Sequence, residues 1–152
     1  MSWIEPIYDR TQSDVDYALA MIEHFKDVEG GVTDGLDLKG CVNVSDLTRI
    51  DRNIIYLCDE LWKYYYFCSV GTSQAWSTSR IPDTWEINRI IGNIQGLLSA
   101  YYKPENAPNL PKTLLSYTDI NAIEENLFRI KEMLDNMIAD FRECGTFNCG
   151  EG

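Results

Sequence analysis

Residues 43–57 read NVSDLTRIDRNIIYL, and two later stretches repeat their pattern. Residues 83–97 read DTWEINRIIGNIQGL, and residues 116–130 read SYTDINAIEENLFRI. In each stretch a capping residue is followed by an acid three positions later, and then by apolar residues at the same four offsets. In the first stretch the apolar residues are Leu47, Ile50, Ile54 and Leu57. A fainter copy begins at Thr11 and Asp14, so the repeat organises most of the chain.

Each copy has the features of a helix start. The capping side chain accepts a hydrogen bond from a free N–H of the first turn, and the acid reaches back to the cap or complements the helix dipole. The apolar spacing then places one stripe along the helix for burial against neighbours. The pattern predicts helices over 12–27, 44–67, 84–102 and 117–141. The corresponding units lie near 11–28, 43–67, 83–102 and 116–141, and a short C-terminal tail covers 142–152.

The segments between these helices are rich in turn-forming residues and unusually long for a bundle. They lie near 29–40, 70–80 and 103–113. Segments of this length can lead the chain back along a helix, so parallel neighbours are as compatible with the sequence as antiparallel ones. The sequence therefore predicts one all-α domain over 1–152, with about four helices in a bundle or repeat-like array joined by long loops. The order and direction of the helices stay open.

The charge balance argues against several classes of partner. The chain has 24 acidic and 13 basic residues, a net charge of −11. A nucleic-acid ligand needs a basic footprint, and acidic lipid surfaces repel such a chain, so neither nucleic acid nor membrane is an expected partner. The longest apolar run, Ile54–Cys58, is far shorter than the ~20 residues of a membrane-spanning helix. The first ten residues lack the pattern of a signal peptide, which indicates a soluble protein made in the cytoplasm.

Cysteine, histidine and acidic residues give little support to a reactive centre. The five cysteines include no C-x-x-C pair, and only Cys144 and Cys149 lie close enough in sequence to suggest a bridge, so free thiols are expected. His24 is the single histidine, and no motif of a nucleophile, phosphate or zinc site occurs. Acids such as those at Glu124-Glu125 are expected on a solvated helix face. We therefore expect no metal, no cofactor and no catalytic activity.

Asparagines recur beside the apolar stripe. Three of them, Asn53, Asn93 and Asn126, stand one position before the third apolar residue of their units. A further pair, Asn88 and Asn121, shares another offset. Asparagine is a mediocre helix former because its amide competes for backbone groups. Its repeated placement predicts hydrogen bonds that tie the linkers to the helices, and a repeated ligand site is the less favoured alternative.

Two further sets of residues are candidates for an interface. Gly92 and Gly96 begin a stripe of small residues that predicts close approach of a neighbour, either within the chain or in another subunit. Aromatic residues gather at the ends of two predicted helices, where they serve an interface or pack under the linkers of the same chain. They are Trp62, Tyr64, Tyr65, Tyr66, Tyr101 and Tyr102.

Nearly the whole chain resembles a group of phage and prophage proteins from Gram-positive bacteria. The resemblance rests on YDRTQSDVDYALAMI at 8–22, LKGCVNVSDLTRIDRNIIYLCDEL at 38–61, and the units at 83–97 and 116–130. Members of this group carry a DRT-x-x-DV opening and repeated D-L-N-R-I-E-x-N-I helices, and they occur among tail, baseplate and fibre-associated components. This chain departs from the repeat at five positions, namely Thr48, Asp51, Ile91, Gly92 and Ala122. The motifs are structural, so the resemblance implies a place in the virion rather than an activity.

The sequence leads to one favoured function and two alternatives. The favoured one is a structural adaptor of a phage or phage-like tail, which contacts other tail, baseplate or fibre proteins and forms homo-oligomers. An alternative is a small acidic protein that mimics nucleic acid and blocks a host defence or transcription protein. Carbohydrate recognition at a tail tip is a further alternative, which requires exposed aromatic residues in a groove.

Overall fold

The predicted all-α fold is confirmed. The computed structural model describes residues 2–26, 37–71, 75–77 and 81–144, except for the side chains of 142–144. This part of the chain holds helices and no strand. The helices are α1 (Gln12–Lys26), α2 (Val44–Lys63), α3 (Thr84–Ala100) and α4 (Tyr117–Cys144). Every helix begins at its predicted residue, whereas the ends differ by one to four residues from the predicted 27, 67, 102 and 141.

The starts are accurate because the capping boxes form as expected. In all four units the acid at the third helical position accepts a hydrogen bond from the backbone N–H of the capping residue. The donor–acceptor distances are 2.8 Å for Thr11–Asp14 and 2.9 Å for Asn43–Asp46, Asp83–Glu86 and Ser116–Asp119. A short local motif thus determines where each helix begins.

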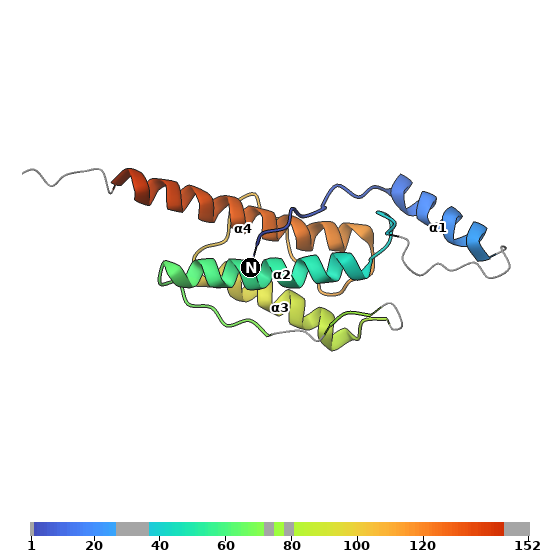
Figure 1. Cartoon of the computed structure of the whole chain (residues 1–152), viewed down its shortest axis with the longest axis horizontal. Helices are drawn as coiled ribbons and strands as arrows, with labels where there is room; N and C mark the ends of the chain where they lie inside the picture. The colour runs from blue at the N-terminus through green and yellow to red at the C-terminus, as the bar shows by residue number, and fades with distance from the viewer. Residues whose placement is uncertain (1, 27–36, 72–74, 78–80, 145–152) are drawn as a thin grey trace, which may run out of the picture.

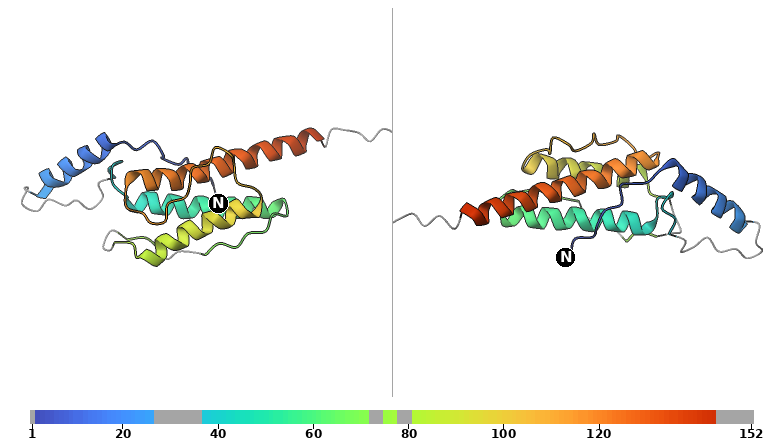
Figure 2. Two further views of the ribbon diagram at one scale, coloured as in Figure 1. Left: turned by 180° about the vertical axis from the view of Figure 1, so that it is seen from behind. Right: turned by 90° about the horizontal axis from the view of Figure 1, so that it is seen from above.

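Helices α2, α3 and α4 form a bundle in which all three run in the same direction. Each of the three contacts the other two. In Figure 1 the chain runs from right to left along every one of them, and the views in Figure 2 agree. The linkers therefore lead back along the bundle, which was one of the topologies left open by their length.

Helix α1 differs from the expected fourth member of the bundle. It lies beyond the N-terminal ends of α2 and α4 (Figure 1), and the apolar stripe that begins at Val15 is absent from the core cluster. Only Ala18 of α1 is buried. Gly40 lies against its first turn, where an added Cβ atom would lie 2.1 Å from the backbone oxygen of Asp14. The weak first copy of the repeat thus forms a capped helix but does not enter the core.

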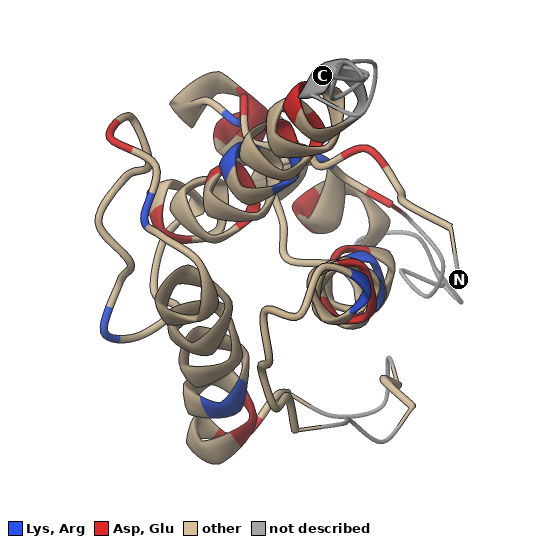
Figure 3. Ribbon diagram, turned by 90° about the vertical axis from the view of Figure 1, so that its left-hand side faces the viewer, with Lys and Arg blue, Asp and Glu red and all other residues tan. Residues whose placement is uncertain are grey.

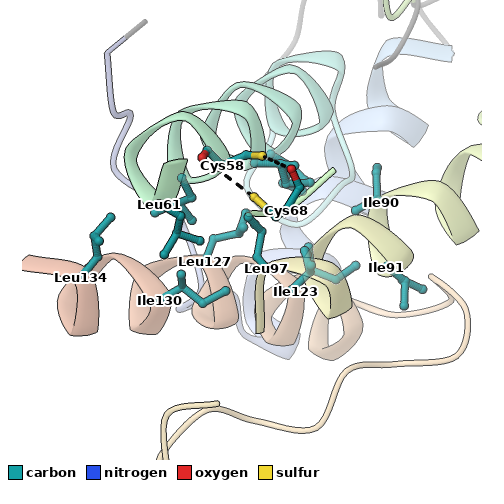
Figure 4. Packing of buried hydrophobic residues seen from close by; sticks show 14 of the residues in the cluster. Cys58, Leu61, Cys68, Ile90, Ile91, Leu97, Ile123, Leu127, Ile130 and Leu134 are labelled. Atoms are coloured by element: carbon teal, nitrogen blue, oxygen red, sulfur yellow. Dashed lines mark hydrogen bonds between the residues drawn. The ribbon is translucent and has the colours of Figure 1, made fainter. Parts of the chain in front are cut away.

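The core is built from the repeated apolar positions. Counted from the capping residue, the four shared offsets are buried in α2, α3 and α4, and α2 and α4 extend the same spacing to Leu61 and Leu134. The side chains with under 2% exposure include Ile50, Ile54, Leu57, Ile90, Ile94, Leu97, Ile120, Ile123, Leu127 and Ile130. Figure 4 shows members from all three helices meeting along the axis of the bundle.

Helix α2 ends four residues earlier than predicted, because Tyr65 takes a left-handed conformation with φ 66°. The N–H of Tyr66 donates to the carbonyl of Leu61 at 3.1 Å, and the N–H of Tyr65 donates to that of Trp62 at 3.1 Å. These two bonds form the Schellman motif, which usually has glycine in the left-handed position. The sequence did not predict that α2 ends here, because residues 64–67 are aromatic and include no glycine.

Candidate functional site

Asparagine amides hold extended segments against the bundle. The side chain of Asn53 accepts a hydrogen bond from the N–H of Ile4 at 3.0 Å and donates to the carbonyl of Ile4 at 2.7 Å. Asn93 makes the same pair of bonds with Gly71, both at 2.9 Å. Each amide therefore satisfies both polar backbone groups of one residue in a segment outside the helices.

The fourth helix repeats part of this arrangement. Asn126 donates to the carbonyls of Pro108 at 3.0 Å and Ala122 at 2.7 Å. Asn121 accepts from the N–H of Arg10 at 3.3 Å and donates to its carbonyl at 2.9 Å. Asn93 and Asn126 thus bond to linkers as expected, whereas Asn53 and Asn121 bond to the N-terminal segment before α1. Asn88, by contrast, is exposed on α3.

We expect replacement of Asn93 by alanine to lower the free energy of unfolding by about 2 kcal/mol, since it removes two hydrogen bonds and leaves the N–H of Gly71 without its partner. The carbonyl of Gly71 keeps the hydrogen bond that Arg89 donates at 3.1 Å. Urea denaturation measures this loss. Asn88→Ala is the matched control on the same helix, and it should change stability by less than about 0.5 kcal/mol. Equal effects of the two substitutions would contradict the role assigned to Asn93.

A buried cluster of four charged side chains joins the N-terminal segment to α2 and α4. Arg10 contacts Asp46 at 2.8 Å and Glu124 at 3.2 Å, while Arg49 contacts the same two acids at 2.5 and 2.6 Å. Glu124 is fully buried and also accepts a hydrogen bond from the N–H of Ile7 at 2.8 Å. The expectation of a solvated face is therefore wrong for Glu124.

The cluster has the character of a structural ion network. Burial by itself lowers the pKa of Arg49, but hydrogen bonds and charge from Glu124 and Asp46 outweigh it, so the pKa is raised. Arg49 consequently stays charged at every pH at which the protein is folded. Two arginines balance two carboxylates, and each carboxylate is held by both arginines. This arrangement holds the N-terminal segment against α2 and α4.

A second ion pair occupies the equivalent place between α2 and α3. Arg89 binds Asp51 through two parallel bonds of 2.8 and 3.0 Å, and Trp76 donates to the same carboxylate at 2.7 Å. Arg49 and Arg89 both stand six residues after their capping residue, and Glu124 and Asp51 both stand eight residues after theirs. An arginine of one helix thus pairs with an acid of the next helix around the bundle.

In the third helix pair, α4 and α3, the same two repeat positions hold uncharged residues. Ala122 stands at the arginine position of α4, and Ile91, which is buried, stands at the acid position of α3. Both belong to the five departures from the repeat identified in the sequence. They mark the one helix pair in which the ion pair is replaced by apolar residues.

The described residues show no centre suited to a metal. No group of three or more histidine, cysteine or acidic side chains among them converges as a metal site would. Cys58 and Cys68 instead exchange weak hydrogen bonds with each other's carbonyls, at 3.4 and 3.8 Å (Figure 4). Burial and the neighbouring Cys58 raise the pKa of Cys68 to about 12, so this thiol stays protonated at neutral pH. Cys149 and the side chain of Cys144 lie outside the described residues.

The small residues of α3 face outward. A Cβ atom at Gly92 would meet nothing within 4 Å among the described residues, and one at Gly96 would meet only the carbonyl oxygen of Ser69 at 3.9 Å. Figure 3 shows α3, the lowest helix in that view, as almost entirely uncharged. No close neighbour within the described part of the chain explains the two glycines, so the neighbour in another subunit stays a prediction.

We expect Gly92→Ala to raise the free energy of unfolding by about 1 kcal/mol, because alanine favours the helix and the site has room for its methyl group. Thermal or urea unfolding of the dilute protein tests this. A loss of stability would show instead that another element lies against Gly92. A lower oligomer mass in the variant would place that element in a second subunit.

The predicted interface aromatics converge at one end of the bundle. We call this set the aromatic end, and its members lie where α2 and α3 finish and α4 continues (Figure 1): Trp62, Tyr64, Tyr65, Tyr66, Phe67, Tyr101, Tyr102 and Phe141. Contacts between distant parts of the chain join them. Tyr66 packs edge-on against Tyr101 with centroids 4.5 Å apart, and Tyr64 stacks on Phe141 at 6.1 Å.

The aromatic end combines packed and exposed rings, so packing within the chain applies to some members, and an interface role of the exposed ones stays a prediction. Tyr64, Tyr66 and Tyr101 pack against the core cluster. The large exposed side chains at this end are Trp62, Tyr65, Phe67, Tyr102 and Phe141. Phe67 packs edge-on against Trp62, whose indole N–H donates to the carbonyl of Cys68 at 2.7 Å. Sequence reasoning missed Phe141 because no other aromatic residue stands next to it in the sequence.

No family model, curated protein or solved structure matches this chain in comparisons with known proteins. Among the described helices, none has both the length and the hydropathy needed to cross a bilayer.

Proposed function

We propose that the chain is a structural component of a phage or phage-like tail, an adaptor that binds neighbouring virion proteins and acts without catalysis. The repeated helix motifs and their resemblance to tail, baseplate and fibre-associated proteins support the virion assignment. The observation that carries the adaptor role is the aromatic end, where five large apolar side chains are exposed together. Such side chains combine apolar area with polar groups and are enriched at protein interfaces.

The backbone at Tyr65 adds support. This side chain is 81% exposed, and its residue occupies a left-handed conformation that costs a non-glycine residue about 1–2 kcal/mol. Neither core packing nor helix termination benefits from tyrosine at this place, because glycine would close the same Schellman motif without strain. A strained, exposed aromatic residue is best explained by a contact with a partner.

Replacing Tyr65 by glycine should therefore stabilise the isolated protein by about 0.5–1 kcal/mol and weaken its assembly with partners. Tyr65→Ala is the matched control, since it removes the ring but keeps the strained conformation. We expect it to weaken assembly equally without the gain in stability. Urea unfolding and the amount of each variant recovered in particles measure the two effects. Normal incorporation of both variants would exclude Tyr65 from the interface.

Mass spectrometry of particles purified from the same genome tests the proposed location. We expect the chain in mature particles at a multiple of three or six copies, because virion parts assemble symmetrically. Absence from the particles would contradict the proposal. If the chain instead binds a host protein, and this binding is lost between low and moderate salt, the nucleic-acid mimic would be the better description.

A further inference from the structure

A groove runs between α4 and the segment that follows α3. Its volume is about 510 Å³, within the range of ligand-binding clefts, and it is open to solvent along one side. Tyr101 and Tyr102 form one wall, and Met133 and Met137 of α4 line the other. We call this cavity the α4 groove. It adjoins the aromatic end through the two tyrosines.

The polar groups of the α4 groove carry an excess of negative charge. Glu105 and Asp140 line it, and among the described residues neither has a hydrogen bond or an ion pair. The lining cation is Arg129, which is already engaged by Glu125 at 3.1 Å and Glu132 at 3.2 Å. Two carboxylates therefore remain available to a ligand, and no cation in the lining is free to balance them.

Two further features of the α4 groove favour a positively charged ligand. Helix α3 ends at Ala100, directly before the two tyrosines, and has no basic residue in its last turn. The partial negative charge of that helix end is therefore not offset by a side chain of α3. Tyr102 is 52% exposed, and an aromatic face attracts a guanidinium or ammonium group within about 6 Å.

We propose that the α4 groove binds a basic peptide segment of a partner protein, with arginine or lysine side chains placed between Tyr102, Glu105 and Asp140. The methionines accept the aliphatic parts of such side chains, since their thioethers adapt to varied shapes. This inference rests on the proposed adaptor function and names the chemistry of one partner. A neutral saccharide would stack on the tyrosines and donate hydroxyl groups to the two carboxylates, but it would leave their negative charge unbalanced.

Titration of the ¹⁵N-labelled protein with N-acetyl-triarginine amide tests the proposal. We expect the largest amide shifts at Tyr102, Glu105 and Asp140. The double variant Glu105→Gln/Asp140→Asn should weaken binding about tenfold at low salt, and Tyr102→Ala about threefold. All three side chains lie at the surface, and circular dichroism checks that the variants keep their helices.

Matched controls on α1 separate groove binding from general attraction to an acidic protein. The double variant Asp16→Asn/Glu23→Gln removes the same charge, and Tyr17→Ala removes a ring that is 61% exposed, against 52% for Tyr102. We expect either change to alter binding less than twofold. Equal weakening by the groove and α1 variants would overturn the proposal. Binding of maltotriose at the same amides, without binding of triarginine, would overturn it in favour of a saccharide.

The outcome is separable from that of the proposed function. If the chain is present in particles but the groove variants bind triarginine normally, only the chemistry of the partner is wrong. If the groove binds triarginine as expected but the chain is absent from particles, only the virion assignment fails.

Discussion

Glu124→Gln should lower the free energy of unfolding by about 3–5 kcal/mol, the largest loss expected from any single conservative substitution in this chain. The carboxylate is fully buried and is the common partner of Arg10, Arg49 and the N–H of Ile7. An amide of the same size leaves the two arginines with one carboxylate, Asp46, in a region that water does not reach. Urea denaturation measures the loss.

The adjacent residue provides a matched control. Glu125 stands on the same helix, but its partner Arg129 lies at the surface, and their contact of 3.1 Å is screened by water. Glu125→Gln should therefore cost less than about 1 kcal/mol. A small effect of both substitutions would show that the buried network contributes little to stability. If both substitutions lowered the free energy of unfolding strongly, the cause would be a general sensitivity of α4 to the loss of an acid and not the buried network.

Ile91→Glu should lower the free energy of unfolding by about 3 kcal/mol or more, because it buries a carboxylate without a partner. The ion pairs between α2 and α4 and between α2 and α3 indicate that an arginine on the neighbouring helix would compensate this carboxylate. Ala122→Arg places an arginine where Arg49 and Arg89 stand in their own helices. We expect the double variant Ile91→Glu/Ala122→Arg to recover at least half of the loss.

A double-mutant cycle tests this design. The coupling energy between positions 91 and 122 should reach about 1.5 kcal/mol or more if the two positions face each other as Asp51 and Arg89 do. The single variant Ala122→Arg completes the cycle and should not stabilise the protein by itself. Additive effects would contradict the view that the bundle has three equivalent helix pairs.

The helical part of the fold follows closely from local sequence. The capping boxes predicted all four helix starts, since each depends on residues within three positions of one another. Helix ends were predicted less well, because the early stop of α2 depends on the conformation of Tyr65. The place of α1 was wrong for a different reason. Its stripe resembles the others in spacing, but spacing alone does not say which stripes share a core.

The candidate sites were predicted in part. Repetition identified Asn53, Asn93 and Asn126, and their contacts with extended segments follow from the tendency of asparagine to bond to the backbone. The ion network escaped prediction because Arg10 and Glu124 are 114 positions apart, and an acid in a helix is normally solvated. The α4 groove was not predicted either, because its lining residues come from two separate segments, 101–106 and 129–140.

The sequence by itself determined the number of helices, their starts and the faces that three of them bury, because capping and apolar periodicity act over a few residues. The tertiary structure alone decided that α2, α3 and α4 run parallel and that α1 lies apart from them. It also decided which charges pair inside the molecule and which aromatic rings remain exposed. These features depend on contacts between residues far apart in the chain, and their energies arise only when the burial of one helix removes water from the side chains of another.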